Sequence, residues 1–403
     1  MKEYFLEELL QIKNGRDHKH LPDGEIPIYG SGGIMRYGNQ SIYNEESILL
    51  PRKGTLSNIQ FVNEPFWTVD TIYYSIVNKE KANPLYLYHY LKQLDLSYLN
   101  SGTGVPSMTF GAYYGVKVNL PSLHIQQKIA KVLSDLDAKI ELNNKINNEL
   151  EAMAKTLYDY WFVQFDFPDA DGKPYKTSGG KMVWNEELKR EIPEGWEVKE
   201  LKRIAKNIMG QSPKGESYNK EGIGTPLLNG PADYENSSLL GRTYTTEPTR
   251  LCKKDDMVLC IRATIGNLTY AEKEFCLGRG VAAVRPNEKR LSEYLFYCLI
   301  QEIERFKRQA TGSIIVGITK DDLTDSKCLI PNGNLIDKFH EIANPIFTKQ
   351  RINKIENLKL SSLRDWLLPM LMNGQVRVGN NTEYKQEDDI LRMAAEPNAH
   401  YKK

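Results

Sequence analysis

The sequence has little of what several common protein classes require. It has five cysteines in 403 residues, all in the second half, odd in number and without a CxxC pair. This pattern indicates neither a disulfide framework nor a zinc site, so we expect free buried thiols in a reducing compartment. No apolar run approaches the ~18 residues that span a membrane, and the start MKEYFLEELL does not read as a secretory leader. We therefore expect a cytoplasmic protein with no membrane segment.

The sequence also lacks a charge excess and a catalytic constellation. Its 53 basic and 52 acidic residues give a net charge of +1, so a DNA-binding face would have to be a local patch. The loop Gly30-Ser31-Gly32-Gly33 lacks the GxxxxGK[ST] form of a phosphate-binding loop. Asn63-Glu64-Pro65-Phe66 is only superficially similar to the NPPY/F box of amino-methyltransferases, and no Gly-rich cofactor loop precedes it. We predict no catalytic residue and no metal site.

The most prominent positive feature is a long helical stretch from Pro121 to Phe167. Residues at alternating steps of three and four form a stripe without an internal Gly or Pro: Leu133, Leu136, Ile140, Asn143, Asn147, Leu150, Ala154, Leu157 and Trp161. Roughly 40 helical residues would make a rod of about 60 Å, which must pair with another helix or separate two domains. Asn143 and Asn147 would either lie in the seam and fix its register, or lie at its edge in solvent.

A second copy of the whole arrangement follows this rod. Ser47-Ile48-Leu49-Leu50 is matched by Asp256-Met257-Val258-Leu259 at an offset of 209, and Thr109 is matched by Thr319 at an offset of 210. A weaker helical stripe runs from Leu335 to Leu367. A period this long indicates a duplicated domain, so the predicted order is domain, helix, domain, helix.

Each domain reads as a mixture of short strands, turns and helices, which predicts an α+β fold. We expect a short amphipathic helix over residues 1–12, with Leu6, Leu9 and Ile12 on one face, and further helices over 85–99 and 201–208. The predicted boundaries are 1–120 and 193–329 for the two domains, 121–167 and 330–375 for the helices, and 168–192 for a linker. The polar tail 376–403 is predicted to be disordered.

Polar side chains recur in equivalent loops of the two domains. Arg and Lys suit guanine edges and phosphates, Asn suits adenine, and Ser and Thr suit either. The candidate DNA-binding residues are Ser31, Arg52, Lys53, Thr55, Ser101, Thr103, Asn229, Tyr234, Arg262, Thr264, Arg279, Thr311 and Ser313. Because the two copies differ in their loops, we expect a bipartite and asymmetric DNA target.

With these residues in view, the chain resembles the specificity subunit of type I restriction–modification systems. The resemblance covers nearly all of the chain and lies in LPSLHIQQKIAKVLSDLDAKI, in MAKTLYDYWF and above all in FDFPDADGKPYKTSGGKMVWNEELKREIPEGWEV. The second helix departs from the first, since Leu335-Ile336-Asp337-Lys338 stands where the QQK-type signature is expected.

The resemblance implies two target-recognition domains separated by two long helices that pair as an antiparallel coiled coil. It implies a non-catalytic subunit that reads double-stranded DNA and docks two modification subunits and, in some systems, restriction subunits. No cofactor is expected in this chain, because S-adenosylmethionine belongs to the modification subunit, and ATP and Mg belong to the restriction subunit. The residues expected on the partner-binding helices are Leu133, Leu136, Ile140, Asn143, Leu150, Leu157, Trp161, Ile346, Ile355 and Leu358.

Three other interpretations stay open. The chain could serve a modification-only system, which differs from a full restriction system only in other chains. It could be a self-sufficient DNA methyltransferase or nuclease, against which the missing cofactor loop argues. It could also be a scaffold whose rod joins partners without reading DNA.

Overall fold

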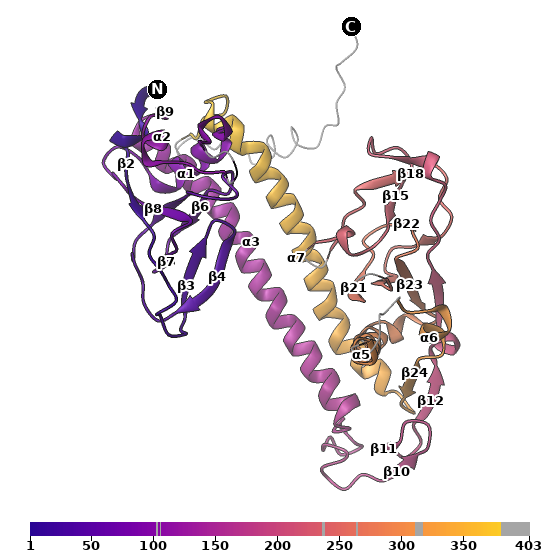
Figure 1. Cartoon of the computed structure of the whole chain (residues 1–403). Coiled ribbons are helices and arrows are strands. Elements are labelled where there is room, and N and C mark those ends of the chain that lie inside the picture. The colour runs from indigo at the N-terminus through magenta and orange to yellow at the C-terminus, as the bar shows by residue number, and fades with distance from the viewer. Residues whose placement is uncertain (102–103, 105, 236–237, 263–264, 311–316, 380–403) are drawn as a thin grey trace. The chain divides into compact units, whose positions relative to one another are not determined.

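The computed structural model describes residues 1–101, 104, 106–235, 238–262, 265–310 and 317–379 (Figure 1). The chain divides into two compact units. Unit 1 consists of Met1–Glu141 with Leu358–Lys403, and unit 2 consists of Leu142–Asn357. Each unit therefore holds one recognition domain and a part of each long helix.

The first domain is built on two small sheets. One has the strand order β2-β8-β5-β6, and the other has the order β4-β3-β7, with β3 and β7 parallel. A further pair, β1 with β9, joins the two ends of the domain. The elements are β1 (Lys2–Phe5), β2 (Leu10–Asn14), β3 (Ile26–Gly30), β4 (Gly33–Gly38), β5 (Ser47–Pro51), β6 (Gln60–Val62), β7 (Trp67–Thr68), β8 (Ile72–Val77), α1 (Pro84–Gln93), α2 (Phe110–Tyr114) and β9 (Lys117–Leu120).

The second domain repeats this plan. Its sheets have the orders β13-β23-β20-β21 and β14-β18-β15-β22-β19, and β12 pairs with β24 as β1 pairs with β9. The elements are β12 (Glu197–Glu200), α4 (Leu201–Ile204), β13 (Ala205–Met209), β14 (Tyr218–Asn219), β15 (Thr225–Leu228), β18 (Thr243–Thr245), β19 (Leu251–Cys252), β20 (Met257–Cys260), β21 (Gly266–Tyr270), β22 (Phe275–Leu277), β23 (Val281–Pro286), α5 (Ser292–Ala310), α6 (Lys320–Thr324) and β24 (Lys327–Ile330). Hairpins β10 (Met182–Asn185) with β11 (Arg190–Pro193), and β16 (Tyr234–Glu235) with β17 (Ser238–Leu239), are additional.

The matched threonines show how closely the copies agree. Thr109 accepts a hydrogen bond from the backbone N of Ala112 at the start of α2, and Thr319 accepts one from Asp322 at the start of α6. Both are helix N-caps, which explains why Thr recurs there. The predicted duplication is confirmed at the level of single turns.

The predicted helix at the N-terminus is wrong. Residues 1–12 form β1, a 3-10 turn (Leu6–Glu8) and the start of β2. Leu6, Leu9 and Ile12 are buried as expected, but Leu10 and Ile12 are buried on either side of exposed Gln11, which is strand alternation. Strand pairing also shortens the predicted helix 201–208. The helix ends at Ile204, because Ala205–Met209 pairs with β23. Helix 85–99 ends at Gln93, before a separate turn (Ser97–Leu99).

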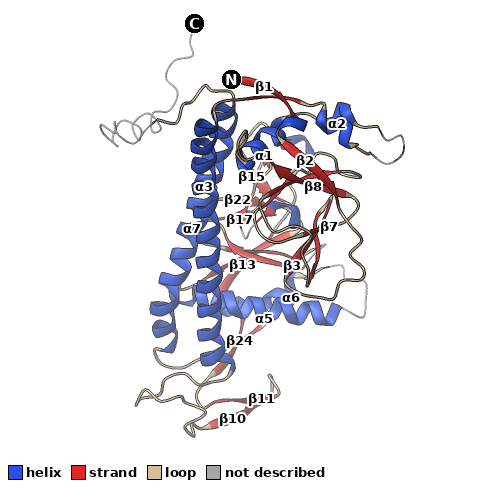
Figure 2. Cartoon of the chain, turned by 90° about the vertical axis from the view of Figure 1, so that its left-hand side faces the viewer, coloured by secondary structure: helices blue, strands red, loops and turns tan. Residues whose placement is uncertain are grey.

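Two long helices, α3 (Leu123–Tyr158) and α7 (Leu335–Met372), are the longest elements (Figure 2). The first begins just after Pro121 and continues into a π-helical turn, Asp159–Val163. In unit 1, Arg364 Nη1 donates to Asp137 Oδ1 at 2.7 Å, and in unit 2, Asn353 Nδ2 donates to Asn147 Oδ1 at 2.8 Å. Within unit 2, Asn143 bonds Glu356 whereas Asn147 bonds Asn353, so residue numbers rise on one helix as they fall on the other and the helices pair antiparallel.

The seam between these helices is polar in unit 2. Asn143 is 1% exposed, Asn147 8% and Asn353 0%, so the alternative of solvated edge asparagines is wrong. Asn143 Nδ2 donates to Glu356 Oε2 at 2.8 Å, and Gln350 Nε2 donates to the carbonyl of Asn147 at 3.0 Å. Such a buried network keeps these hydrogen bonds in only one helix register.

The apolar stripe expected on the second helix is buried at its start, at Leu335 and Phe339, but not further along. Ile352, Ile355, Leu358 and Leu363 are between 43% and 53% exposed. The buried residues of α7 are Leu335, Ile336, Phe339, Ala343, Phe347, Asn353, Leu371 and Met372. Apolar residues lie on two faces of this helix, so periodicity alone could not identify the buried one.

We predict that Asn353→Leu destabilises unit 2 by about 1–3 kcal/mol, because it leaves the buried Oδ1 of Asn147 without its donor. The double variant Asn147→Leu/Asn353→Leu should recover part of that loss, since neither unsatisfied amide remains. Chemical denaturation of the two single variants and the double variant gives the coupling energy. Strictly additive effects would show that the two amides are not coupled.

His89 is a buried titratable group in unit 1. Its side chain on α1 is 7% exposed, and neither ring nitrogen has a hydrogen-bond partner in the described part of the chain. Burial lowers the pKa of His89 to about 4, opposed by Asp137 of α3 and assisted by Lys92 and Arg364. Protonation of the folded state is thus unfavourable at pH values where an unfolded histidine, with a pKa near 6.5, is already charged.

Unit 1 should therefore lose stability as the pH falls from about 6.5 to about 4, by roughly 3 kcal/mol from this residue, because the unfolded chain binds the proton first. His89→Leu should remove that slope. The measurement is urea unfolding as a function of pH, with hydrogen exchange in peptides of unit 1 as the readout. The exposed His124, changed to Gln, serves as the control, and an unchanged slope in His89→Leu would contradict the assignment.

Candidate nucleic-acid interface

In the first domain, three loops that carry predicted DNA-binding residues meet. Ser31 lies in the β3–β4 turn, Arg52, Lys53 and Thr55 follow β5, and Ser101 lies in the segment before α2. The backbone N of Met108 donates to the carbonyl of Arg52 at 2.9 Å, and the N of Gly54 donates to Pro106 at 3.0 Å. Ser101 N in turn donates to Ser107 at 3.0 Å. The structure brings these five predicted residues to one surface.

The β3–β4 turn is held against the β5 loop by amide side chains that the sequence analysis did not select. Asn58 Nδ2 donates to the carbonyl of Ser31 at 2.7 Å, and Gln60 Nε2 donates to that of Gly30 at 3.1 Å. Gly54 takes a φ of 87°, and a Cβ there would lie 3.2 Å from Ser31 Oγ. The recurrence of Asn58 as Asn267 in the second copy was the available signal for this supporting role.

In the second domain, Asn229, Arg262 and Arg279 lie on neighbouring loops. Asn229 follows β15, and a Cβ on Gly280 would lie 2.0 Å from its carbonyl oxygen. The N of Ile261, next to Arg262, donates to the carbonyl of Gly280 at 2.9 Å. The loops therefore pack closely enough that only glycine fits beside Arg279.

Of the remaining predicted residues, only Tyr234 lies in the described part of the chain. Tyr234 directs its hydroxyl into the domain core. Burial raises the pKa of this hydroxyl well above the usual value, and the neighbouring Cys260 thiol adds a smaller effect in the same direction. A buried hydroxyl cannot reach a DNA base, so Tyr234 is a poor candidate for a base contact. Thr103, Thr264, Thr311 and Ser313 lie outside the described residues.

The exposed cations of these loops are not held by carboxylates of the described residues. Lys53, Arg262 and Arg279 are exposed and form no ion pair with any residue described. Arg52 is half-buried, with its guanidinium 5.8 Å from the centre of the Tyr73 ring. Elsewhere, cations such as Arg285 are held by carboxylates, here by Asp256 in two hydrogen bonds of 2.7 Å. Unpaired cations on pinned loops are available to phosphates or base edges.

The described residues contain no group of three or more His, Cys, Asp or Glu side chains that could hold a metal ion. All five cysteines are buried free thiols. None of the helices described is long and apolar enough to cross a membrane.

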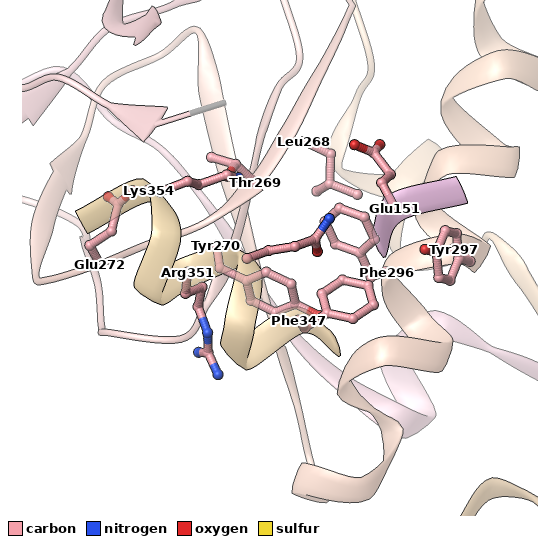
Figure 3. Close-up of a pocket in the computed structure, with 11 residues that line it drawn as sticks. Glu151, Leu268, Thr269, Tyr270, Glu272, Phe296, Tyr297, Phe347, Arg351 and Lys354 are labelled. Atoms are coloured by element: carbon pink, nitrogen blue, oxygen red, sulfur yellow. The ribbon is translucent and has the colours of Figure 1, made fainter. Parts of the chain in front are cut away.

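A small cavity in unit 2 lies between the second domain and the helix pair (Figure 3). Its volume is ≈ 80 Å³, and aromatic rings of Tyr270, Phe296, Tyr297 and Phe347 line it. Burial raises the pKa of Glu272 and lowers that of Lys354, which also line it. Opposite charges at its wall and its small size fit a packing junction, with room for little more than water.

The duplicated domains, the antiparallel helix pair and the loop clusters define a nucleic-acid specificity protein. Residues 1–152 and 193–361 match the family model of the type I restriction modification DNA specificity domain. The chain belongs to this family and is a non-catalytic, DNA-sequence-recognising specificity subunit.

The relatives are specificity subunits as well. A Methanocaldococcus jannaschii protein assigned as the specificity subunit of type I restriction enzyme MjaX is 30% identical over 75% of this chain and 70% of its own length. The HindI specificity subunit of Haemophilus influenzae is 25% identical over 68% of this chain and 72% of its own length. The crystal structure of the S subunit from M. genitalium has a TM-score of 0.64 at 17% identity, covering 92% of this chain and 95% of that one. The latter likeness shows the fold.

Proposed function

We propose that the chain reads a bipartite, asymmetric DNA target, with one half-site for each recognition domain. The observation that carries this proposal is the repetition of one backbone plan with different exposed side chains. Ser31, Arg52 and Lys53 gather on the first domain, whereas Asn229, Arg262 and Arg279 gather on the second. Two copies of one scaffold with different side chains suit two different short sequences.

We also propose that the long helices dock two modification subunits, which would supply S-adenosylmethionine and the methylation chemistry in the cytoplasm. Restriction subunits, with ATP and Mg, would join the same assembly where a system has them. A modification-only system would use this chain in the same way. This chain itself would bind none of these cofactors.

The expected partner-binding residues separate into two groups in the structure. Leu133, Asn143 and Trp161 are buried within the chain, and Leu136, Ile140, Leu150, Leu157 and Ile346 are half-buried. Ile355 and Leu358 are about half exposed, as are Ile352, Leu363 and Trp366 along α7. These five residues, called here the α7 stripe, lie in unit 2 (Ile352 and Ile355) and in unit 1 (Leu358, Leu363 and Trp366). They are the better docking candidates, because exposed apolar side chains on a helix favour protein contacts.

The function is tested by co-expressing the chain with its modification subunit and mapping methylated adenines by single-molecule sequencing. We expect a split motif. Exchange of residues 1–120 for the matching domain of a relative should change one half of the motif and leave the other half unchanged. A motif that changes in both halves, or no motif from a complex whose modification subunit is active, would overturn the proposal.

Docking is tested with Ile355→Asp/Trp366→Asp on the α7 stripe. Both side chains are exposed, so we expect the fold to persist and affinity for the modification subunit to fall at least tenfold, or about 1.4 kcal/mol. Ile223→Asp, which changes an equally exposed residue away from α7, is the control. Size-exclusion chromatography with light scattering reads the outcome, and an intact complex at all concentrations would remove the stripe from the interface.

A further inference from the structure

One turn is built identically in the two recognition domains. It joins β7 to β8 through Val69–Thr71 in the first domain, and β22 to β23 through Gly278–Gly280 in the second. Val69 N donates to Tyr29 O at 3.0 Å, as Gly278 N donates to Leu228 O at 2.7 Å. The turn is closed in both by a 3.2 Å hydrogen bond, from Ile72 N to Val69 O and from Val281 N to Gly278 O.

A second loop is pinned against this turn in the same way in both copies. A Cβ on Gly15 would lie 2.0 Å from the carbonyl oxygen of Val69, and one on Gly210 would lie 2.1 Å from that of Gly278. The next residue then hydrogen-bonds the preceding strand: Arg16 N donates to Thr68 O, and Gln211 N to Leu277 O, both at 2.8 Å. Main-chain geometry therefore fixes the two loops to each other without using side chains.

The side chains at these positions differ between the copies. The tip of the turn is Asp70 in the first domain and Arg279 in the second, and the neighbouring loop carries Arg16 and Gln211 respectively. All four residues are exposed. Neither tip residue forms an ion pair with any residue in the described ranges. One backbone thus presents opposite charges at the same point.

The tips lie beside the loop clusters already described. Arg52 Nη1 donates to the carbonyl of Asp70 at 3.3 Å, and Ser31 N donates to Thr71 Oγ1 at 3.4 Å. In the second domain, the carbonyl of Gly280 accepts from Ile261, which precedes Arg262. The turn therefore belongs to the same surface as the predicted DNA-binding residues.

The chemistry of the tips matches different base edges. An arginine donates to the N7 and O6 acceptors of guanine, and a carboxylate accepts from an exocyclic amino group in the major groove. A carboxylate at a DNA surface is repelled by phosphates, so its presence there needs a donor to offset that cost. An exocyclic amino group supplies such a donor, whereas a phosphate does not.

We propose that the tip of this turn is a specificity-determining position in each domain. Arg279 reads a guanine in the half-site of the second domain. Asp70 reads an exocyclic amino group, N4 of cytosine or N6 of adenine, in the half-site of the first. Arg16 and Gln211 lie next to the tips and extend the same reading surface. The inference rests on the proposed half-site reading, which it deepens to single positions.

The test uses the full chain in complex with its modification subunit and compares wild type with Asp70→Asn and Arg279→Gln. Both changes keep the approximate side-chain size and leave the main-chain hydrogen bonds of the turn in place. We expect each to relax or change one base position in its own half of the methylated motif, with preference there falling roughly 5- to 100-fold. Asp23→Asn and Lys206→Gln remove equal charges from other exposed positions and should leave the motif unchanged.

Modified oligonucleotides identify the atoms. Replacing the read guanine with 7-deazaguanine should weaken binding of wild type but not of Arg279→Gln. At the Asp70 position, purine riboside in place of adenine, or uracil in place of cytosine, distinguishes the two amino groups. A motif unchanged in active variants would overturn the inference while leaving the bipartite reading intact. Uniform loss over all sequences would show that the tips contact phosphates and would also overturn it.

Discussion

The hydrogen bond between Asn147 and Asn353 is the constraint on which the arrangement of the helices depends. Asn147 lies on α3 and Asn353 on α7, 206 positions further along the chain. The bond of 2.8 Å therefore joins the two helix copies directly, and it is buried. A leucine pair would tolerate a slip of one helical turn, whereas two amides lose their partners on any slip. The register of the duplicated helices is thus set by polarity rather than by apolar packing.

Within each unit, the helices and the recognition domain share one hydrophobic core. In unit 2, Tyr158, Trp161 and Phe162 at the end of α3 pack with Phe339 of α7 and with Tyr294 of the domain. In unit 1, Ala130 and Leu133 of α3 and Leu371 of α7 join the core of the first domain. A domain held this way cannot reorient on its helices without exposing aromatic or aliphatic surface. The loops that carry the candidate DNA-binding residues are consequently fixed to the core of their own unit.

The sequence was most informative where a residue has one physical role. Thr109 and Thr319 recur because both cap helices, and Asn143 and Asn147 interrupt an apolar stripe because they bond across it. It was least informative where two periods competed. Leu6, Leu9 and Ile12 fit a helix by spacing, but pairing of β2 with β8 decided the structure, and Ile355 lies on one of two apolar faces of α7. Asp70 carries no basic or amide group that would mark it in the sequence as a DNA contact, and only the hydrogen bonds of its turn place it beside Arg52.

The low net charge of +1 fits a protein in which reading and attraction are separate tasks. Nonspecific affinity for DNA grows with the number of phosphates that cations neutralise, and it carries no sequence information. A chain whose loops present Asp70 in one copy and Arg279 in the other gains little from bulk electrostatics, since the two charges cancel. The two tips still differ in hydrogen bonding, because Arg279 donates and Asp70 accepts from the same backbone position. In the proposed half-site reading, duplication followed by substitution at such fixed points would alter the sequence read by one domain without disturbing the core that holds the loop.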